Sequence, residues 1–200
     1  MRLTLSTAAA QDLTIPELLE ACRLRGLAGL ELVAGHAHGI GPGTDLREIA
    51  EARAAAAEAG VVIAAYRAAS RNQAMGEGAA RLSVALSAPV VVPASEVMDD
   101  DAIATAATLY ARVGGVLRLE HPSDAESAAA LRRLAERVGG NALGLAWEAD
   151  PADPRFAADA KDVLQGAGPF LRHVRLLGGG PEAAGQEGQG IGAMMARLTL

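Results

Sequence analysis

The sequence has few aromatic side chains, which make up 2% of its 200 residues. It contains a single cysteine, and only one of its 18 basic residues, Lys161, is a lysine. The single Cys22 excludes an internal disulfide, and its place in an amphipathic helical pattern predicts a small buried core residue. Because half of the residues are apolar and few are aromatic, the core has to consist mainly of alanine, leucine and valine.

The chain also lacks the features of nucleic-acid-binding and membrane-spanning proteins. Its net charge of -6 leaves no basic surface for a nucleic acid, so we predict no such partner. No apolar run reaches the roughly 18 residues that a membrane span requires, and no signal-peptide pattern opens the sequence. These absences predict a soluble, cytoplasmic protein with no membrane partner.

Seven short apolar runs recur along the chain at intervals of 27 to 32 residues. They are RLTLS near residue 2, GLELVA near 29, VVIAAY near 61, PVVVPA near 89, VLRLE near 116, LGLAW near 143 and HVRLL near 173. This interval is the length of a strand, a helix and two short loops. Alternating strands and helices predict a parallel sheet with helices on its faces.

The intervals between the runs carry helix signals. Residues 14–17 and 123–126 fit a capping box, and Asp45 with Glu48 offers a looser version. Glycines 26, 60 and 139 are placed to end helices just before the next strand.

Two architectures fit seven near-equal units, namely an eight-stranded (β/α) barrel and an open doubly wound sheet. No GxGxxG or GxxxxGK[ST] motif follows the first strand, which disfavours the nucleotide-binding sheet. We therefore predict a single TIM-barrel domain over residues 1–200 with about seven recognisable units. The eighth strand is missing or incomplete, since the last residues fit either a short strand, ARLTL, or the helix that we favour.

Polar residues follow the predicted strands at the end where barrel enzymes place their functional groups. They are His36, His38, Tyr66, Arg67, Ser95, Glu96, Glu120, His121, Trp147, Glu148, Asp150 and, within the last strand, Arg175. A buried strand is a poor place for an unpaired guanidinium, so Arg175 requires a partner in the barrel.

The motifs GLAGLELVAGHAHG, EAGVVIAAY, VLRLEHP, LGLAWEAD and LRHVRLLGGG resemble, in this order, units two, three, five, six and seven of the xylose isomerase-like TIM barrels. This superfamily includes sugar phosphate isomerases and epimerases. The resemblance implies a divalent metal (Mn²⁺, Mg²⁺, Co²⁺ or Zn²⁺) held by residues at the ends of strands five to eight. Glu120 matches the first ligand and Glu148 stands where an Asp is expected. Arg175 replaces a histidine ligand, and the strand carrying the last ligand is absent.

Two functions remain open on this basis. In the first, the protein is a sugar (phosphate) isomerase or epimerase acting on a small polyol or keto-sugar, with Glu120 and Glu148 as catalytic groups and metal ligands. In the second, it is a catalytically inactive relative that binds a ligand or partner. In both, we expect Arg175 to contact Glu120 or Glu148 in place of a cation.

His36, His121 and Arg175 are the predicted contacts to the sugar-like ligand. His121 follows Glu120 directly, so its side chain points to the opposite face of the sheet if the strand continues. This placement favours a supporting role for His121. His36 and His38 lie in a glycine-flanked loop that we expect to be exposed, and His173 is predicted to be a core histidine. The glycine-rich loop after residue 177 is either a phosphate cradle or an active-site loop. A barrel open between its first and seventh strands leaves bare edges, which predicts a homo-oligomer, coverage by residues 190–200, or poor solubility.

Overall fold

Seven parallel strands form one sheet in the computed structural model, which describes residues 4–92, 99–121, 125–138, 142–149 and 156–176. The strands are β1 (Thr4–Ser6), β2 (Gly29–Val33), β3 (Val62–Arg67), β4 (Val90–Val92), β5 (Leu117–His121), β6 (Leu143–Ala149) and β7 (Leu171–Leu176). Their order in the sheet is their order in the chain, and each strand pairs with the next. The predicted seven-unit barrel is thereby confirmed.

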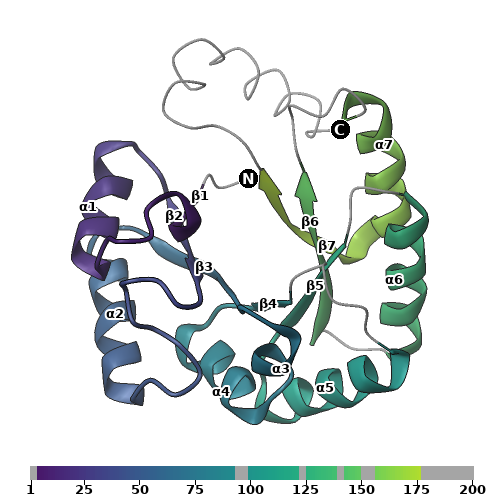
Figure 1. Ribbon diagram of the computed structural model, residues 1–200, viewed down its shortest axis with the longest axis horizontal. Coiled ribbons are helices and arrows are strands. Elements are labelled where there is room, and N and C mark those ends of the chain that lie inside the picture. Colours follow the sequence, from purple (N-terminus) through teal and green to yellow (C-terminus); the bar gives the residue numbers. More distant parts are fainter. Residues whose placement is uncertain (1–3, 93–98, 122–124, 139–141, 150–155, 177–200) are drawn as a thin grey trace.

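Helices connect the strands and cover the outside of the curled sheet (Figure 1). They are α1 (Ile15–Leu24), α2 (Leu46–Glu58), α3 (Arg71–Ala74), α4 (Glu77–Leu86), α5 (Asp100–Val113), α6 (Ala125–Val138) and α7 (Phe156–Ala167), with 3-10 turns at Thr7–Ala9 and Gly168–Phe170. None of the helices within the described ranges is long and apolar enough to cross a bilayer.

The helix signals in the sequence act as expected. Thr14 and Glu17 form the predicted capping box of α1, and Asp45 caps α2 by accepting a hydrogen bond from the Arg47 amide. Gly26 and Gly60 have φ angles of 63° and 70°, a left-handed conformation that residues with a Cβ rarely adopt. The predicted caps at residues 123 and 139 lie outside the described residues.

The sheet has two faces with different packing. Its outer face and the helices enclose the main core, which includes the fully buried Trp147, Tyr66 and Tyr110 and the predicted buried Cys22. Its inner face holds a small apolar cluster of Ala65, Val91 and Ala146. Because successive residues of a strand point to opposite faces, this inner face also receives the charged residues described below.

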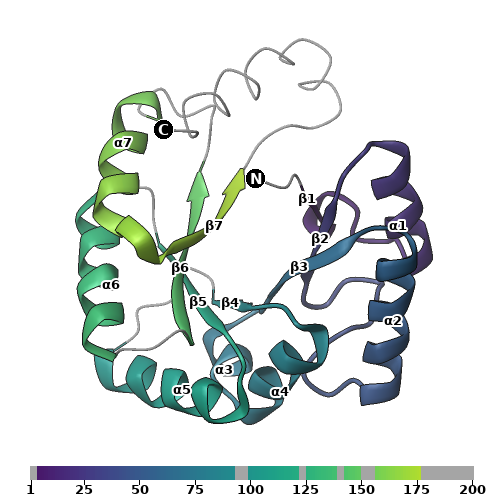
Figure 2. The same cartoon turned by 180° about the vertical axis from the view of Figure 1, so that it is seen from behind.

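The barrel is open in the described chain. β1 and β7 lie at the two edges of the sheet and do not pair with each other (Figure 2), as the missing eighth unit predicted. Residues 177–200, with the predicted final helix and the glycine-rich loop, lie outside the described part. Homo-oligomerisation and a single domain over 1–200 remain predictions.

Candidate functional site

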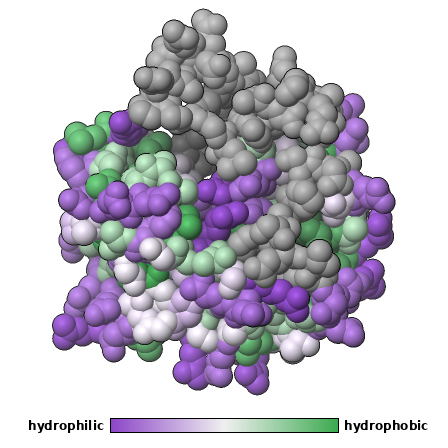
Figure 3. Space-filling model, in the orientation of Figure 1, coloured by the Kyte–Doolittle hydropathy of each residue, from purple (hydrophilic) through white to green (hydrophobic). Residues whose placement is uncertain are grey.

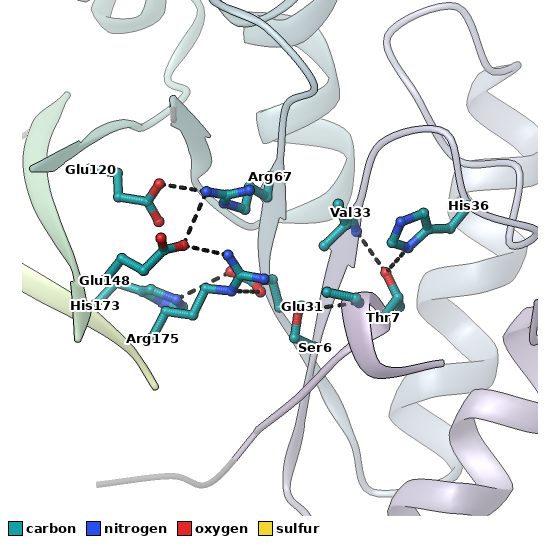
Figure 4. Close-up of polar contacts among 11 residues, drawn as sticks. Ser6, Thr7, Glu31, Val33, His36, Arg67, Glu120, Glu148, His173 and Arg175 are labelled. Carbon is teal, nitrogen blue, oxygen red and sulfur yellow. Dashed lines mark hydrogen bonds and ion pairs between the residues drawn. The ribbon is translucent and has the colours of Figure 1, made fainter. Parts of the chain in front are cut away.

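Charged side chains from four strands meet inside the barrel, at the carboxyl ends of the strands. Glu120 of β5, Glu148 of β6, Arg67 of β3 and Arg175 of β7 point toward one another (Figure 4). Ala146 belongs to the apolar cluster of the inner face and Glu148 is two residues further along β6, so both side chains share this face. Hydrophilic residues gather at the centre of one face, inside the ring of helices (Figure 3). We call this group of four side chains the mouth cluster.

Arg67 connects the two predicted catalytic carboxylates. Its Nη2 donates a hydrogen bond of 2.6 Å to Glu120 Oε2 and one of 3.2 Å to Glu148 Oε2. Burial by itself would lower the pKa of Arg67, but the hydrogen bond with Glu120 and the charges of Glu120, Glu148 and Glu31 outweigh it and raise the pKa above its ordinary value. Arg67 therefore stays charged and holds the carboxylates of β5 and β6 together.

Arg175 completes this network from the other side. Its Nη1 donates a hydrogen bond of 2.5 Å to Glu148 Oε2, the oxygen that Arg67 also contacts. The expected contact between Arg175 and one of the two carboxylates is thus present. Charge-assisted hydrogen bonds of this kind are stronger than neutral ones.

Glu31 of β2 adds a third carboxylate that the sequence analysis did not single out. Its side chain is 2% exposed, and its oxygens lie 3.3 Å from His173 Nε2 and 3.5 Å from Arg175 Nε. Burial alone would raise the pKa of Glu31, but His173 and Ser6, followed by the charge of Arg175, outweigh it and lower the pKa. With the mouth cluster, this gives three carboxylates against two guanidiniums, with His173 as an additional titratable group.

Glu31 and Arg67 could have been found by the argument applied to Arg175. Glu31 is a charged residue in the middle of the apolar run GLELV, and it too needs a buried partner. Arg67 ends its strand, where its fixed charge likewise requires an acidic partner. Glu31 lies in β2 and Arg67 in β3, and these two strands pair with each other.

The mouth cluster does not offer the donor set of the implied metal site. Across the ranges that the structure describes, no three His, Cys, Asp or Glu side chains are grouped so that they could hold a metal ion. Both predicted ligands, Glu120 and Glu148, are instead engaged by Arg67. A cation bound between them would face two fixed positive charges, and like charges repel.

His36 and His38 lie apart from this network. His36 Nδ1 is 2.9 Å from Thr7 Oγ1, which also accepts a hydrogen bond from the Val33 amide. His38 is buried, whereas the sequence predicted an exposed loop. The reason is that its ring forms hydrogen bonds with the backbone of its own loop. Its Nδ1 accepts a hydrogen bond from the Ile40 amide, so its Nε2 donates to the Val33 carbonyl. Burial, as the largest cause, lowers the pKa of His38.

Several of the remaining predicted site residues lie outside the described residues. His121 ends β5 in register with Trp147, but its side chain lies outside the described residues, as do Ser95, Glu96 and Asp150. His173 is a barrel-interior residue with an 11% exposed side chain and Glu31 as its partner. The assignment of His36, His121 and Arg175 to substrate binding, and of Glu120 and Glu148 to catalysis or metal binding, stays a prediction.

Comparison with known proteins shows what this fold is similar to. No protein-family model and no curated protein matches the sequence. Among solved structures, a D-psicose 3-epimerase with D-tagatose from Clostridium cellulolyticum H10 is 13% identical with a TM-score of 0.65, and the match covers 98% of this chain and 82% of that one.

Two further solved structures are similar to this chain. A sugar phosphate isomerase/epimerase from Parabacteroides distasonis is 11% identical with a TM-score of 0.58, over 98% of this chain and 92% of that chain. A xylose isomerase-like TIM barrel protein from Mycobacterium smegmatis, in complex with magnesium, is 12% identical with a TM-score of 0.58, over 86% and 73%. The chain therefore has a (β/α) TIM-barrel fold similar to that of these proteins, and its described part is open between β1 and β7.

Proposed function

We propose that this protein is sugar isomerase- or epimerase-like and binds a small polyol or keto-sugar in the mouth of the barrel. The observation that carries the proposal is the convergence of Glu120 and Glu148 on Arg67 at adjacent strand ends. Similar solved structures include a D-psicose 3-epimerase with D-tagatose and a sugar phosphate isomerase/epimerase. Their likeness supports the class of ligand, and the charged side chains of the mouth support the chemistry.

The reaction of this class is the transfer of a proton next to a carbonyl group. One carboxylate removes the proton from the carbon beside the ketone, and the electron pair left behind forms an enediolate with its negative charge on oxygen. In an isomerisation the proton then returns to the former carbonyl carbon, while the hydroxyl proton of the first carbon passes to the former ketone oxygen. In an epimerisation the proton returns to the opposite face of the same carbon, and the ketone forms again. Two carboxylates on opposite sides of the substrate can act as base and acid in turn.

The guanidiniums of the mouth cluster can stabilise the charge that develops on the substrate oxygen. Arg67 and Arg175 are already fixed by Glu120 and Glu148, and preorganised positive groups lower the energy of an oxyanion without further rearrangement. In this scheme the sugar hydroxyls replace some of the hydrogen bonds that the arginines now make to the carboxylates. This step frees a carboxylate oxygen to act as the base.

A second candidate function is ligand binding without chemistry. The observation that favours it is that guanidiniums engage both Glu120 and Glu148. Carboxylate oxygens that accept hydrogen bonds from guanidiniums are not free to take a proton from a substrate carbon. In this case the mouth would retain a sugar-like ligand and release it unchanged.

Proton exchange in deuterated water separates the two functions. The protein is incubated with D-psicose and with D-tagatose, and NMR records deuterium at the carbons beside the ketone, while calorimetry records binding. The proposal expects exchange that falls about a hundredfold or more in Glu120→Gln, whereas the control Glu51→Gln, an exposed ion-paired residue of α2, keeps it. Binding without exchange establishes the second function, and the absence of both overturns the proposal.

A further inference from the structure

A β-bulge deeper in the barrel brings two arginines together. In the pairing of β6 with β7, Leu145 is opposite Leu171 and Ala146 is opposite His173, so Arg172 is an extra residue in β7. A bulge re-aims a side chain relative to the regular alternation of a strand. Arg172 and His173 therefore both reach the inner face, although they are neighbours in the sequence.

Gly144 shows where the side chain of Arg172 lies. A Cβ atom placed on Gly144 would be 3.5 Å from Arg172 Cγ and 3.7 Å from Arg118 Cγ. Arg118 of β5 is also directly opposite Gly144 in the register of β5 and β6. The side chains of Arg118 and Arg172 thus lie on either side of Gly144, which has no side chain to separate them. Arg118 precedes Glu120 by two residues along β5.

These two guanidiniums have no counter-charge within the described ranges. Neither Arg118 nor Arg172 forms an ion pair there, and Arg118 Nε is buried without a hydrogen-bond partner. Burial, and then the charge of Arg172, lower the pKa of Arg118 to about 10, so Arg118 stays charged at neutral pH. Like charges held side by side without a carboxylate cost stability unless an anion balances them.

We propose that Arg118 and Arg172 bind an oxyanion of the phosphate class over Gly144. Guanidinium groups match the geometry of such an anion through paired N–H donors. Solvent reaches the position, because Arg172 is exposed and Arg118 is only partly buried. The site is distinct from the mouth cluster, since Arg118 precedes Glu120 by two residues, roughly 7 Å along the strand.

Thermal unfolding of the full chain tests the site with inorganic phosphate as the probe. Phosphate that binds only the folded protein raises the melting temperature by mass action. We expect a rise in millimolar phosphate that exceeds the effect of sodium chloride at the same ionic strength. Calorimetric titration should show that Arg172→Gln weakens phosphate binding about tenfold or more, the effect of one lost charge-assisted contact.

The controls keep this test independent of the proposed function. Arg172 is exposed, so its substitution is expected to leave the fold intact. Arg118→Gln should show the same loss, and Arg81→Gln, an exposed arginine paired with Glu77, should show none. The anion could be free phosphate or the phosphate group of a monoester. A parallel titration with glycerol phosphate distinguishes the two, because tighter binding than that of inorganic phosphate identifies a phosphate monoester. A phosphate effect no larger than that of chloride, or one that survives in Arg172→Gln, overturns the proposal.

Discussion

The two charged layers inside the barrel differ in how their charges are balanced. At the mouth, the carboxylates of Glu120 and Glu148 are paired with Arg67 and Arg175 by hydrogen bonds of 2.5 to 3.2 Å. In the deeper layer, Arg118 and Arg172 lie over Gly144 without an acidic partner in the described chain. The mouth supplies its own counter-charges, whereas the described residues around Arg118 and Arg172 supply none.

This difference separates the ligands that suit each layer. A neutral polyol or keto-sugar can enter the mouth by exchanging hydrogen bonds with a network whose charges already offset one another. An anion entering the mouth would meet the carboxylates of Glu120 and Glu148. The deeper arginines, in contrast, gain most from an oxyanion, since each guanidinium there would acquire a charged partner.

Removal of Arg67 should break the balance of the mouth most strongly. Arg67→Met leaves Glu120, whose side chain is 2% exposed, beside Glu148 without the guanidinium that joins them. Breaking a buried pair by removing one partner costs about 3 to 5 kcal/mol, so the free energy of unfolding in urea should fall by about that amount.

The matched control is Arg81→Met, which removes an exposed arginine paired with Glu77 on the surface of α4. Exposed ion pairs contribute less than about 1 kcal/mol. If the two variants lose similar stability, the mouth cluster is not the balanced network described above.

Replacement of Arg175 by histidine should change which cation the mouth accepts. Arg175→His removes a fixed charge 2.5 Å from Glu148 and introduces a neutral imidazole, a common metal ligand. Calorimetric titration with Mn²⁺ should show binding about tenfold tighter than in the parent, because charge repulsion at this distance exceeds about 1 kcal/mol.

The comparison variant is Arg175→Ala, which removes the charge without adding a ligand. It leaves Glu148 with one fewer partner and should unfold more easily than the parent. If Arg175→His binds Mn²⁺ no more tightly than the parent, the guanidinium does not stand in the place of the cation.

The sequence predicts the fold and the role of Arg175 because both follow from spacing. Runs at intervals of 27 to 32 residues determine the order of the strands, and polar residues at their ends determine which side chains meet. A guanidinium within a buried run requires an acid, and Glu148 is that acid. The same reasoning was open for Glu31, which is buried between His173 and Arg175.

The deeper layer could not be predicted in this way. Regular alternation places Arg172 on the face opposite to His173 and Arg175, toward the helices. The bulge between β6 and β7 reverses this placement, and a change of register depends on the packing of neighbouring strands rather than on the residues of one strand. The network at Arg67 likewise depends on three strands whose stagger the sequence does not encode locally.

The smallest expected effect comes from the deeper layer. Arg118→Met replaces a partly buried charge by an apolar side chain of similar length. Such a change is often neutral or stabilising, so we expect the free energy of unfolding to rise by about 1 kcal/mol in chloride buffer at neutral pH. Since burial, and then the charge of Arg172, lower the folded-state pKa of Arg118 from its ordinary value to about 10, the charged group disfavours the folded state at neutral pH. This penalty fades as the pH rises through 10 and the folded protein releases the proton first.

Urea unfolding at pH 7 and pH 10.5 should therefore show a stability advantage of Arg118→Met over the parent that shrinks as the pH rises. Phosphate at pH 7 should also shrink this advantage, because it stabilises only the parent. An advantage that is unchanged by both treatments would mean that Arg118 costs stability through packing and not through its unbalanced charge.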